Sequence, residues 1–452
     1  MRLRPPAIAV FLAIAATACA RGPVNTDAQL YAMVDTIGLA ELRRSPERAA
    51  VLGVAVQTFG EDYRSRLDDR SMAAVERMRA TRLDFLRQLE AVDRATLSRD
   101  ASRTLEIAQR VVSSTVKMDA YSFGYADLGR ASPYLISQMD GAYAGVIDFM
   151  TVDQTIGSRA DADAWLARLE HVDDAVTDEY RRFEIDRERG VLPPAGILQQ
   201  ALEKARALQS ADPLAHPLTQ FFAESLSQLN DLPEGEIASL IGKAAGIVED
   251  DIGPVYDRLV TLLETSAASA APEPGVWRIP NGEAYYEDAL RLYTTSDLTP
   301  RQIRDVGVAL VEELTGEINT ALIALGRTEG TVGQRLEAMR LEPLFLYPDT
   351  LEGRAALLAA VSERASWGEQ KAPAMLSVAA AAQVEIKLAP ASLETAGPDI
   401  HYRPAALDGS RQAALILNLR STLDWPNWTL PTLAYREAAP GRHLQLGIAR
   451  AR

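Results

Sequence analysis

Cysteine and histidine are almost absent from this sequence, and both shortages limit the chemistry that it can support. Cys19 is the one cysteine in 452 residues, so no disulfide can form within the chain and zinc sites built from several cysteines are excluded. A metal site based on histidine has to draw on His171, His216, His401 and His443. No P-loop and no glycine-rich dinucleotide motif follows an expected strand, so neither kind of nucleotide site is predicted.

Basic residues are also fewer than acidic ones, 47 against 62. The formal net charge is −15, which repels the phosphates of nucleic acids and the headgroups of anionic lipids. We therefore expect no nucleic-acid partner. Because 47% of the residues are hydrophobic, a chain of this length can bury a large core.

The N-terminus has the features of an export signal. Arg2 and Arg4 precede an apolar stretch that is too short to span a bilayer comfortably. Small residues directly before Cys19 resemble a bacterial lipoprotein signal; the alternative is an ordinary secretory signal that happens to contain a cysteine. We predict a signal peptide at 1–18 and a protein held to the cell envelope by its acyl chains alone. Because Ala20 and not aspartate follows the cysteine, the expected location is the outer membrane, facing the periplasm.

Apolar residues recur at helical spacing through most of the chain, which predicts a mainly α fold. The clearest helix runs from Thr299, its expected N-cap, to Gly326, its expected stop, with Pro300 in the first turn and Gln302 completing a capping box. We expect its apolar stripe to pack in the core; the stripe consists of Ile303, Val306, Leu310, Leu314, Ile318, Leu322 and Leu325.

Other helical patterns share the same period and cover 70–92, 105–116, 161–189, 195–208, 234–266 and 351–367. Gly253-Pro254 is expected to kink or divide the pattern in which it lies. A run of serine, alanine and proline begins at Ser266 and indicates a linker or long surface loop. We therefore expect an N-terminal helical half at 19–265, a linker at 266–280 and a C-terminal helical half at 281–452.

Strand patterns are few and lie late in the chain. Val384–Leu388 alternates as a half-buried strand does, and Gln412–Leu419 is a continuous apolar run that follows the turn Asp408-Gly409-Ser410. After a loop rich in tryptophan and proline, a final helix is expected from about Leu430. This order predicts a small sheet beside the last helix.

The segment from Tyr435 to Gln445 looks like a zinc-hydrolase motif in which arginine replaces two histidines. With it, three stretches resemble the bacterial domain-of-unknown-function 885 family: Gly190–Pro194, Gly282–Gly307, and Leu407–Gln445 with its motif at the end. The family's usual motif is HExxPGHHLQ, and a later acidic motif, roughly EGWxxY, is associated with a further ligand. The chain ends at Arg452 without that second motif, so we expect a truncated motif region.

The resemblance implies a large helical zincin-like fold with the small β-sheet next to the motif helix, zinc as the family's cofactor, and a peptide or small amide as substrate. Glu437 matches the general base and His443 matches one of the paired histidines. Arg436 and Arg442 stand where the family has histidine. The resemblance leaves open whether position 442 or 443 supplies the second ligand.

Arginine disables such a site because a guanidinium offers no lone pair and carries a fixed positive charge. A catalytic zinc needs about three protein ligands and one position for water. In a regular helix, positions 436 and 443 lie about 10 Å apart along the axis, so one ion could contact both only if Pro440-Gly441 distorted the helix. We predict that zinc is absent or weakly bound, and that Glu437 makes an ion pair with Arg436 or Arg442.

The remaining candidate residues have a functional and a structural interpretation. Tyr402, Arg411 and Asn418 could line a peptide cleft in which Arg411 binds a carboxylate; alternatively, Arg411 anchors the turn before it. His401 could replace a lost zinc ligand, although a loop histidine is more often exposed to solvent. His171 and His216 are expected on the surface.

Three hypotheses about function follow from these observations. The first is a decayed copy of an exported peptidase-like lipoprotein with impaired catalysis. The second is a pseudoenzyme that binds peptides without cleaving them. The third is an active metallohydrolase that uses a different set of ligands.

Overall fold

The computed structural model describes residues 26–209, 212–376, 383–389 and 399–451. Helices account for 67% of the structure and strands for 4%, so the mainly α prediction is confirmed. The expected signal peptide at 1–18 and Cys19 lie outside the described residues. Within the described ranges, none of the helices combines the length and the apolar character that a bilayer crossing requires.

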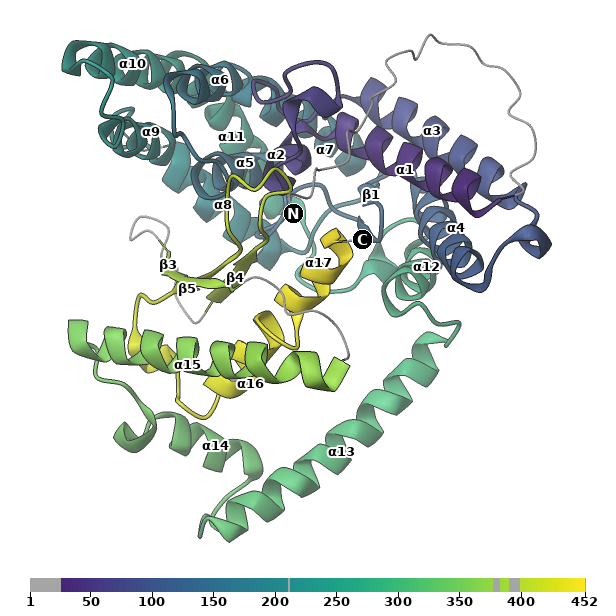
Figure 1. Cartoon of the computed structure of the whole chain (residues 1–452), viewed down its shortest axis with the longest axis vertical. Helices are drawn as coiled ribbons and strands as arrows, with labels where there is room; N and C mark the ends of the chain where they lie inside the picture. The colour runs from purple at the N-terminus through teal and green to yellow at the C-terminus, as the bar shows by residue number, and fades with distance from the viewer. Residues whose placement is uncertain (1–25, 210–211, 377–382, 390–398, 452) are drawn as a thin grey trace, which may run out of the picture.

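The N-terminal half is a group of packed helices with one short β-hairpin (Figure 1). Its elements are α1 (Asp27–Arg44), α2 (Pro46–Leu52), α3 (Met72–Glu90), α4 (Arg99–Asp119), β1 (Tyr125–Asp127), β2 (Arg130–Ser132), α5 (Ala142–Asp148), α6 (Arg159–Leu169), α7 (Val172–Glu188), α8 (Ala195–Gln209), α9 (Pro217–Ser227), α10 (Glu234–Ile247) and α11 (Gly253–Ser269). Its largest core lies among α5 to α11, where Trp165 stacks on Phe222 with 4.5 Å between ring centroids. Burial of such aromatic pairs supplies much of the hydrophobic stabilisation.

The next helix, α12 (Gly282–Thr294), also packs on this half although it follows the expected linker. Its Tyr285 ring lies 5.0 Å from that of Tyr121 and 5.5 Å from that of Phe123. The first residues of the expected linker, from Ser266, form the last turn of α11. The packing boundary between the two halves therefore falls after α12.

The C-terminal half contains a three-stranded sheet covered by helices. Its elements are α13 (Pro300–Ala324), α14 (Val332–Arg340), α15 (Leu351–Leu376), β3 (Glu385–Leu388), β4 (Asp399–Arg403), β5 (Ala414–Asn418), α16 (Leu430–Glu437) and α17 (Arg442–Ala451). The central strand β5 pairs parallel to β3 and antiparallel to β4, with Tyr402 opposite Leu415. Leu415 and Leu417 are fully buried in one core with Leu357 of α15 and Leu430 of α16. The predicted small sheet therefore lies next to the motif segment.

Several expected elements have different boundaries in the structure. The 161–189 pattern forms two helices, α6 and α7. The 234–266 pattern is divided as predicted, with a π-helical segment, Val248–Ile252, before Gly253-Pro254. The segment around His401, expected as a loop, is strand β4. Its alternation is too short and too polar to stand out in the sequence.

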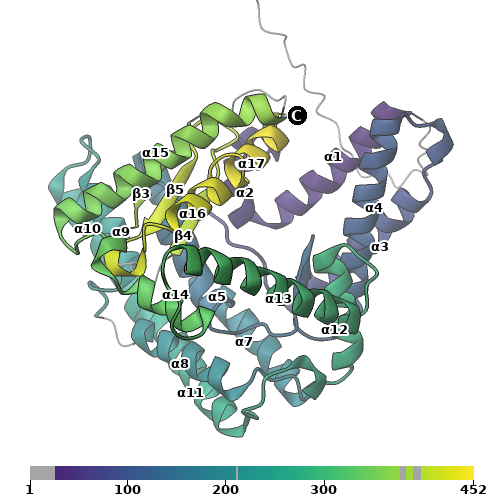
Figure 2. The same ribbon diagram turned by 90° about the horizontal axis from the view of Figure 1, so that it is seen from below.

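The predicted caps of α13 are confirmed, but its predicted core packing is wrong. Thr299 accepts a hydrogen bond from the Gln302 backbone at 3.3 Å, and its own N–H donates to the Gln302 side chain at 2.9 Å. Gly326 follows the helix with a φ of +73°. Among the residues of α13, Leu322 is the one that is buried. In Figures 1 and 2 the helix is joined to α12 and α14 at its ends.

The prediction that His216 lies on the surface is also wrong. Its side chain is 1% exposed and caps the N-terminus of α9, where Nδ1 accepts a hydrogen bond from the Leu218 backbone at 3.3 Å. Burial lowers the pKa of His216 to about 4. The sequence showed a loop here, and a loop residue that caps a helix can be buried.

Replacing His216 with asparagine, which also caps helices well, should remove one source of acid sensitivity. The folded-state pKa of about 4 lies below the unfolded value of 6.5. The unfolded state therefore binds more protons between these values, and the stability is present above pH 6.5 and is lost as the pH falls towards 4. Relative to the variant, we expect the wild type to lose about 2 kcal/mol between about pH 7.5 and about pH 5.

Urea denaturation of both proteins at the two pH values measures this difference. Other groups that titrate in this range, such as Asp186, are present in both proteins, so their contributions to the pH dependence of stability cancel in the comparison. Equal pH dependence in the two proteins would contradict the buried neutral histidine.

Candidate functional site

The motif segment forms two short helices and not one. The final helix expected from about Leu430 ends at Glu437, and α17 begins at Arg442. Pro440 cannot donate a helical hydrogen bond, which favours a break at this point. The turn is also tight, since a Cβ atom on Gly441 would lie 2.0 Å from the carbonyl oxygen of Arg436.

Helix α15 packs closely against the same turn at a second glycine, Gly368. A Cβ atom on Gly368 would lie 2.0 Å from the carbonyl oxygen of Ala439. Trp367 and Tyr435 pack beside this contact, with 5.5 Å between ring centroids. Any side chain at Gly368 would therefore separate α15 from the motif turn.

The arginine–glutamate cluster consists of Arg436, Glu437 and Arg442. Nη1 of Arg436 lies 2.8 Å from Oε1 of Glu437, and Nη1 of Arg442 lies 2.9 Å from Oε2. The glutamate side chain is 1% exposed, whereas the two arginine side chains are 64% and 43% exposed. The predicted ion pair is thus present with both arginines, one on each carboxylate oxygen.

His443 and Tyr402 meet in the same half of the molecule. Nδ1 of His443, in α17, lies 2.9 Å from the hydroxyl of Tyr402, in β4, and both side chains are buried. The direction of this hydrogen bond depends on the histidine tautomer. The contact fixes α17 against the sheet.

These residues do not fit a catalytic zinc site. Among the described residues, no three His, Cys, Asp or Glu side chains are grouped closely enough to hold a metal ion. Both oxygens of Glu437 face guanidinium groups, and the guanidinium groups of Arg436 and Arg442 offer no lone pair to a metal ion. The nearby fixed positive charges also repel a divalent cation.

Arg411 lies in the loop between β4 and β5, and Asn418 lies at the end of β5. Nη2 of Arg411 donates to the carbonyl oxygens of Val51 and Pro404, which ties the β4–β5 loop to the end of α2. In Figure 1 this loop projects from the sheet towards α2 and away from α16. Arg411 also borders a cavity of about 490 Å³. Asn418 is buried at the end of β5, opposite Asp399 in the strand register.

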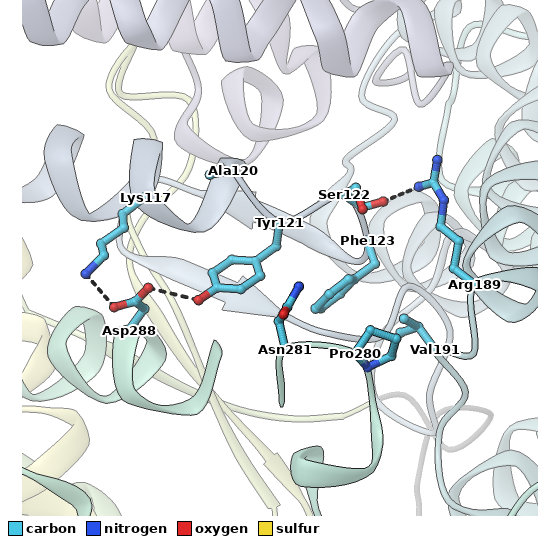
Figure 3. A pocket seen from close by; sticks show the side chains of 10 residues that line it. All are labelled: Lys117, Ala120, Tyr121, Ser122, Phe123, Arg189, Val191, Pro280, Asn281 and Asp288. Atoms are coloured by element: carbon cyan, nitrogen blue, oxygen red, sulfur yellow. Dashed lines mark hydrogen bonds and ion pairs between the residues drawn. The ribbon is translucent and has the colours of Figure 1, made fainter. Parts of the chain in front are cut away.

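A larger feature, a cavity of about 540 Å³, lies between the ends of α4 and α7 and the start of α12 (Figure 3). Tyr121 and Phe123 form its aromatic wall. At one end Asp288 pairs with Lys117 at 2.6 Å and accepts a hydrogen bond from Tyr121 at 2.9 Å. At the other end Arg189 donates to the carbonyl oxygen of Ser122.

The hydroxyl of Tyr121 stays protonated at neutral pH. Burial, with the hydrogen bond to Asp288, raises the pKa of Tyr121 to about 12. A smaller cavity of about 320 Å³ shares Phe123 and Arg189 and contains Asp186. Burial raises the pKa of Asp186 to about 6, although the Gly124 N–H donates to it at 2.8 Å.

The sequence analysis did not predict this cavity, although it singled out two stretches of the chain that border it. Two of the three stretches that carry the family resemblance border it, Gly190–Pro194 through Val191 and Gly282–Gly307 through Asp288. The backbone there is tightly packed, because a Cβ atom on Gly282 would lie 1.7 Å from the carbonyl oxygen of Val276. Stretches far apart in the sequence thus converge on one cavity.

The chain matches the family described as bacterial protein of unknown function (DUF885) over residues 46–452, and it belongs to that family. A similar solved structure is the crystal structure of a candidate lipoprotein from Colwellia psychrerythraea. The similarity covers 94% of this chain and 73% of that chain, with a TM-score of 0.88 and 26% sequence identity. No curated protein matches the chain.

Replacing both Arg436 and Arg442 with methionine should destabilise the fold, because it leaves the Glu437 carboxylate buried without a partner. We expect a loss of about 1–3 kcal/mol, less than for a fully buried pair because both guanidinium groups are partly exposed. Adding Glu437→Gln to the double variant should recover much of the loss, since the buried charge is then removed.

Arg301→Met is the control, since this side chain is 91% exposed, and it should change the stability by less than about 0.5 kcal/mol. Chemical denaturation of all four proteins provides the comparison. If the glutamine does not relieve the loss, the arginines act through packing and not through charge.

Proposed function

We propose that this protein is an envelope lipoprotein of peptidase-like ancestry whose motif site binds no zinc and does not cleave peptides. The observation that carries the proposal is the arginine–glutamate cluster. The residue that matches the family's general base is buried between two guanidinium groups, and these come from the positions of the family's histidines. A general base has to reach a water or a substrate proton, and this carboxylate faces cations instead.

The envelope location is supported by two independent features. Small residues precede Cys19 in a short export signal, and the similar protein from Colwellia psychrerythraea is a candidate lipoprotein. Acyl chains on Cys19 would hold the protein to the outer membrane, facing the periplasm. The charge of −15 gives no attraction to anionic lipid, so the anchor itself would supply the membrane affinity.

The cavity in Figure 3 is the proposed place for a peptide or small amide ligand. Its aromatic wall offers apolar contact area, and its two ends carry charged groups of both signs, Lys117 with Asp288 and Arg189. A short peptide also has an apolar body and charged termini.

Metal analysis of the purified protein tests the first part of the proposal. We expect zinc far below one ion per chain after dialysis. The double variant Arg436→His and Arg442→His supplies imidazoles at the family's positions, and we expect it to bind zinc at least about tenfold more tightly than the wild type.

The control places two histidines on the exposed part of α13, as Arg301→His and Arg304→His, and should not bind zinc more tightly by the same amount. Wild-type protein that holds nearly one zinc per chain, and loses it in His443→Ala, would overturn the metal-free site.

Calorimetric titration with tripeptides that have free termini tests the second part. Phe123→Ala and Arg189→Gln should each weaken binding about tenfold, since each removes one kind of contact from the cavity. Tyr286→Ala, an exposed aromatic residue of α12 outside the cavity lining, should leave the affinity unchanged. Equal effects of all three variants would place the peptide elsewhere.

A further inference from the structure

Three arginine side chains line the cavity of about 320 Å³ that contains Asp186, here called the arginine cavity. Each donates a hydrogen bond to a main-chain carbonyl oxygen of the segment between α4 and β1. Arg79 of α3 donates to Tyr121 at 3.0 Å, Arg182 of α7 donates to Gly124 at 3.1 Å, and Arg189 donates to Ser122. A guanidinium group has five N–H donors, so most donors of these side chains remain available to a ligand.

These arginines have few carboxylate partners. Among the described residues, none forms an ion pair within 4.0 Å with Arg182 or Arg189, and Arg79 has a single contact of 4.0 Å, from its Nε to Asp119. The same Nε is buried and has no hydrogen-bond partner in the described part of the chain. By contrast, Arg82, about one turn further along α3, pairs with three carboxylates. The arginine cavity is therefore lined by guanidinium groups whose charge the described carboxylates balance poorly.

Arg182 is the most enclosed of the three arginines, with 9% of its surface exposed. Burial lowers the pKa of its guanidinium, and the like charges of Arg79 and Arg70 act in the same direction. Glu179 and Asp186 attract it from beyond the distance of an ion pair. A buried cation is unfavourable unless a counterion and hydrogen bonds compensate for the lost water. An anion in the arginine cavity would supply that compensation.

The carboxyl groups of the lining limit the charge of such an anion. Two of them, Glu76 and Asp186, stand against the three guanidinium groups. One oxygen of Asp186 is occupied, because it accepts the N–H of Gly124 at 2.8 Å. A ligand with two negative charges would be repelled by both carboxyl groups, whereas a carboxylate carries one charge and matches the planar guanidinium donors. The lining therefore favours a carboxylate over a phosphate.

The arginine cavity adjoins the cavity in Figure 3, because Ser122, Phe123 and Arg189 line both. In Figure 3, Arg189 lies beyond Phe123 and at the opposite end from Asp288. A peptide that packs on the ring of Phe123 can therefore extend one end past Arg189 towards Arg182. The arginines would meet the end of the peptide that carries the carboxylate.

We propose that the arginine cavity is a carboxylate subsite, in which Arg79, Arg182 and Arg189 hold the C-terminus of a peptide whose body lies in the cavity of Figure 3. The inference rests on the proposed peptide ligand and makes it more specific. It assigns the direction of the peptide and restricts the ligands to peptides with a free C-terminus.

Calorimetric titration of the full exported chain with alanyl-phenylalanyl-alanine and with its C-terminal amide tests the subsite. The two ligands differ in the terminal carboxylate alone. We expect the wild type to bind the free acid at least about tenfold more tightly than the amide. Arg182→Gln should reduce this preference to about twofold or less, by weakening the acid and not the amide.

Arg181→Gln is the matched control. Arg181 is the neighbour of Arg182 in α7, its side chain is 69% exposed, and it lines neither cavity. This variant should keep the preference of the wild type for the free acid. Circular dichroism of each variant establishes that it is folded.

Asp186→Asn should change the affinity in the opposite direction. It removes a negative charge beside the carboxylate, so we expect the free acid to bind at least about threefold more tightly and the amide to bind as before. Asparagine can still accept the N–H of Gly124. If Arg182→Gln does not fold, this variant is the test, and an acid affinity that does not rise would overturn the subsite.

Equal binding of the acid and the amide by the wild type would overturn the subsite and leave the peptide cavity in place. Equal loss of the preference in Arg182→Gln and Arg181→Gln would overturn it as well. If neither tripeptide binds, the peptide ligand is wrong, and the C-terminus is overturned with it as the source of the carboxylate. Acetate offers the same group without a peptide, and acetate that binds as tightly as the free acid would also overturn the peptide as the source.

Discussion

The carboxylate of Glu437 is shielded from water and lies between two guanidinium groups, and the charge balance of the motif segment depends on this contact. A buried carboxylate without a partner would be strongly unfavourable. The cluster joins α16 to α17 across the turn that separates them, because Arg436 and Glu437 end one helix and Arg442 begins the next. The positive charge that balances this buried carboxylate is supplied by two side chains of the protein itself.

Much of the fold could be predicted from local patterns. Helical periodicity located most helices, and the residues Thr299, Gln302 and Gly326 marked both ends of α13 correctly because capping depends on neighbouring residues alone. The apolar run of β5 was visible because a strand buried on both faces has little polar content. Periodicity and capping residues could not show which apolar helix faces would be buried against other elements of the fold. The stripe of α13 has the same spacing as buried stripes elsewhere, and its exposure follows from the arrangement of the whole chain.

In the candidate site, too, the sequence predicted the contacts between near neighbours in the chain but not those that depend on tertiary packing. The sequence motif was enough to predict the ion pairing of Glu437 with its arginine neighbours, since these residues lie within a few positions of each other in the sequence. The contact between Tyr402 and His443 joins residues 41 positions apart and depends on how α17 packs against the sheet. The burial of His216 and the cavity beside Tyr121 likewise arise from tertiary packing. The family stretches at Gly190–Pro194 and Gly282–Gly307 were noticed in the sequence, but their convergence became visible only in three dimensions.

The close approach of Gly368 and Gly441 to the motif turn has an evolutionary consequence. The backbone around Glu437 is shaped by glycine contacts that do not involve the arginine side chains. Substitutions at positions 436 and 442 can therefore change the chemistry of the segment without rebuilding its path. Other side chains at these two positions would alter the charge next to Glu437 while the polypeptide scaffold persists, so a lineage could vary this chemistry one substitution at a time.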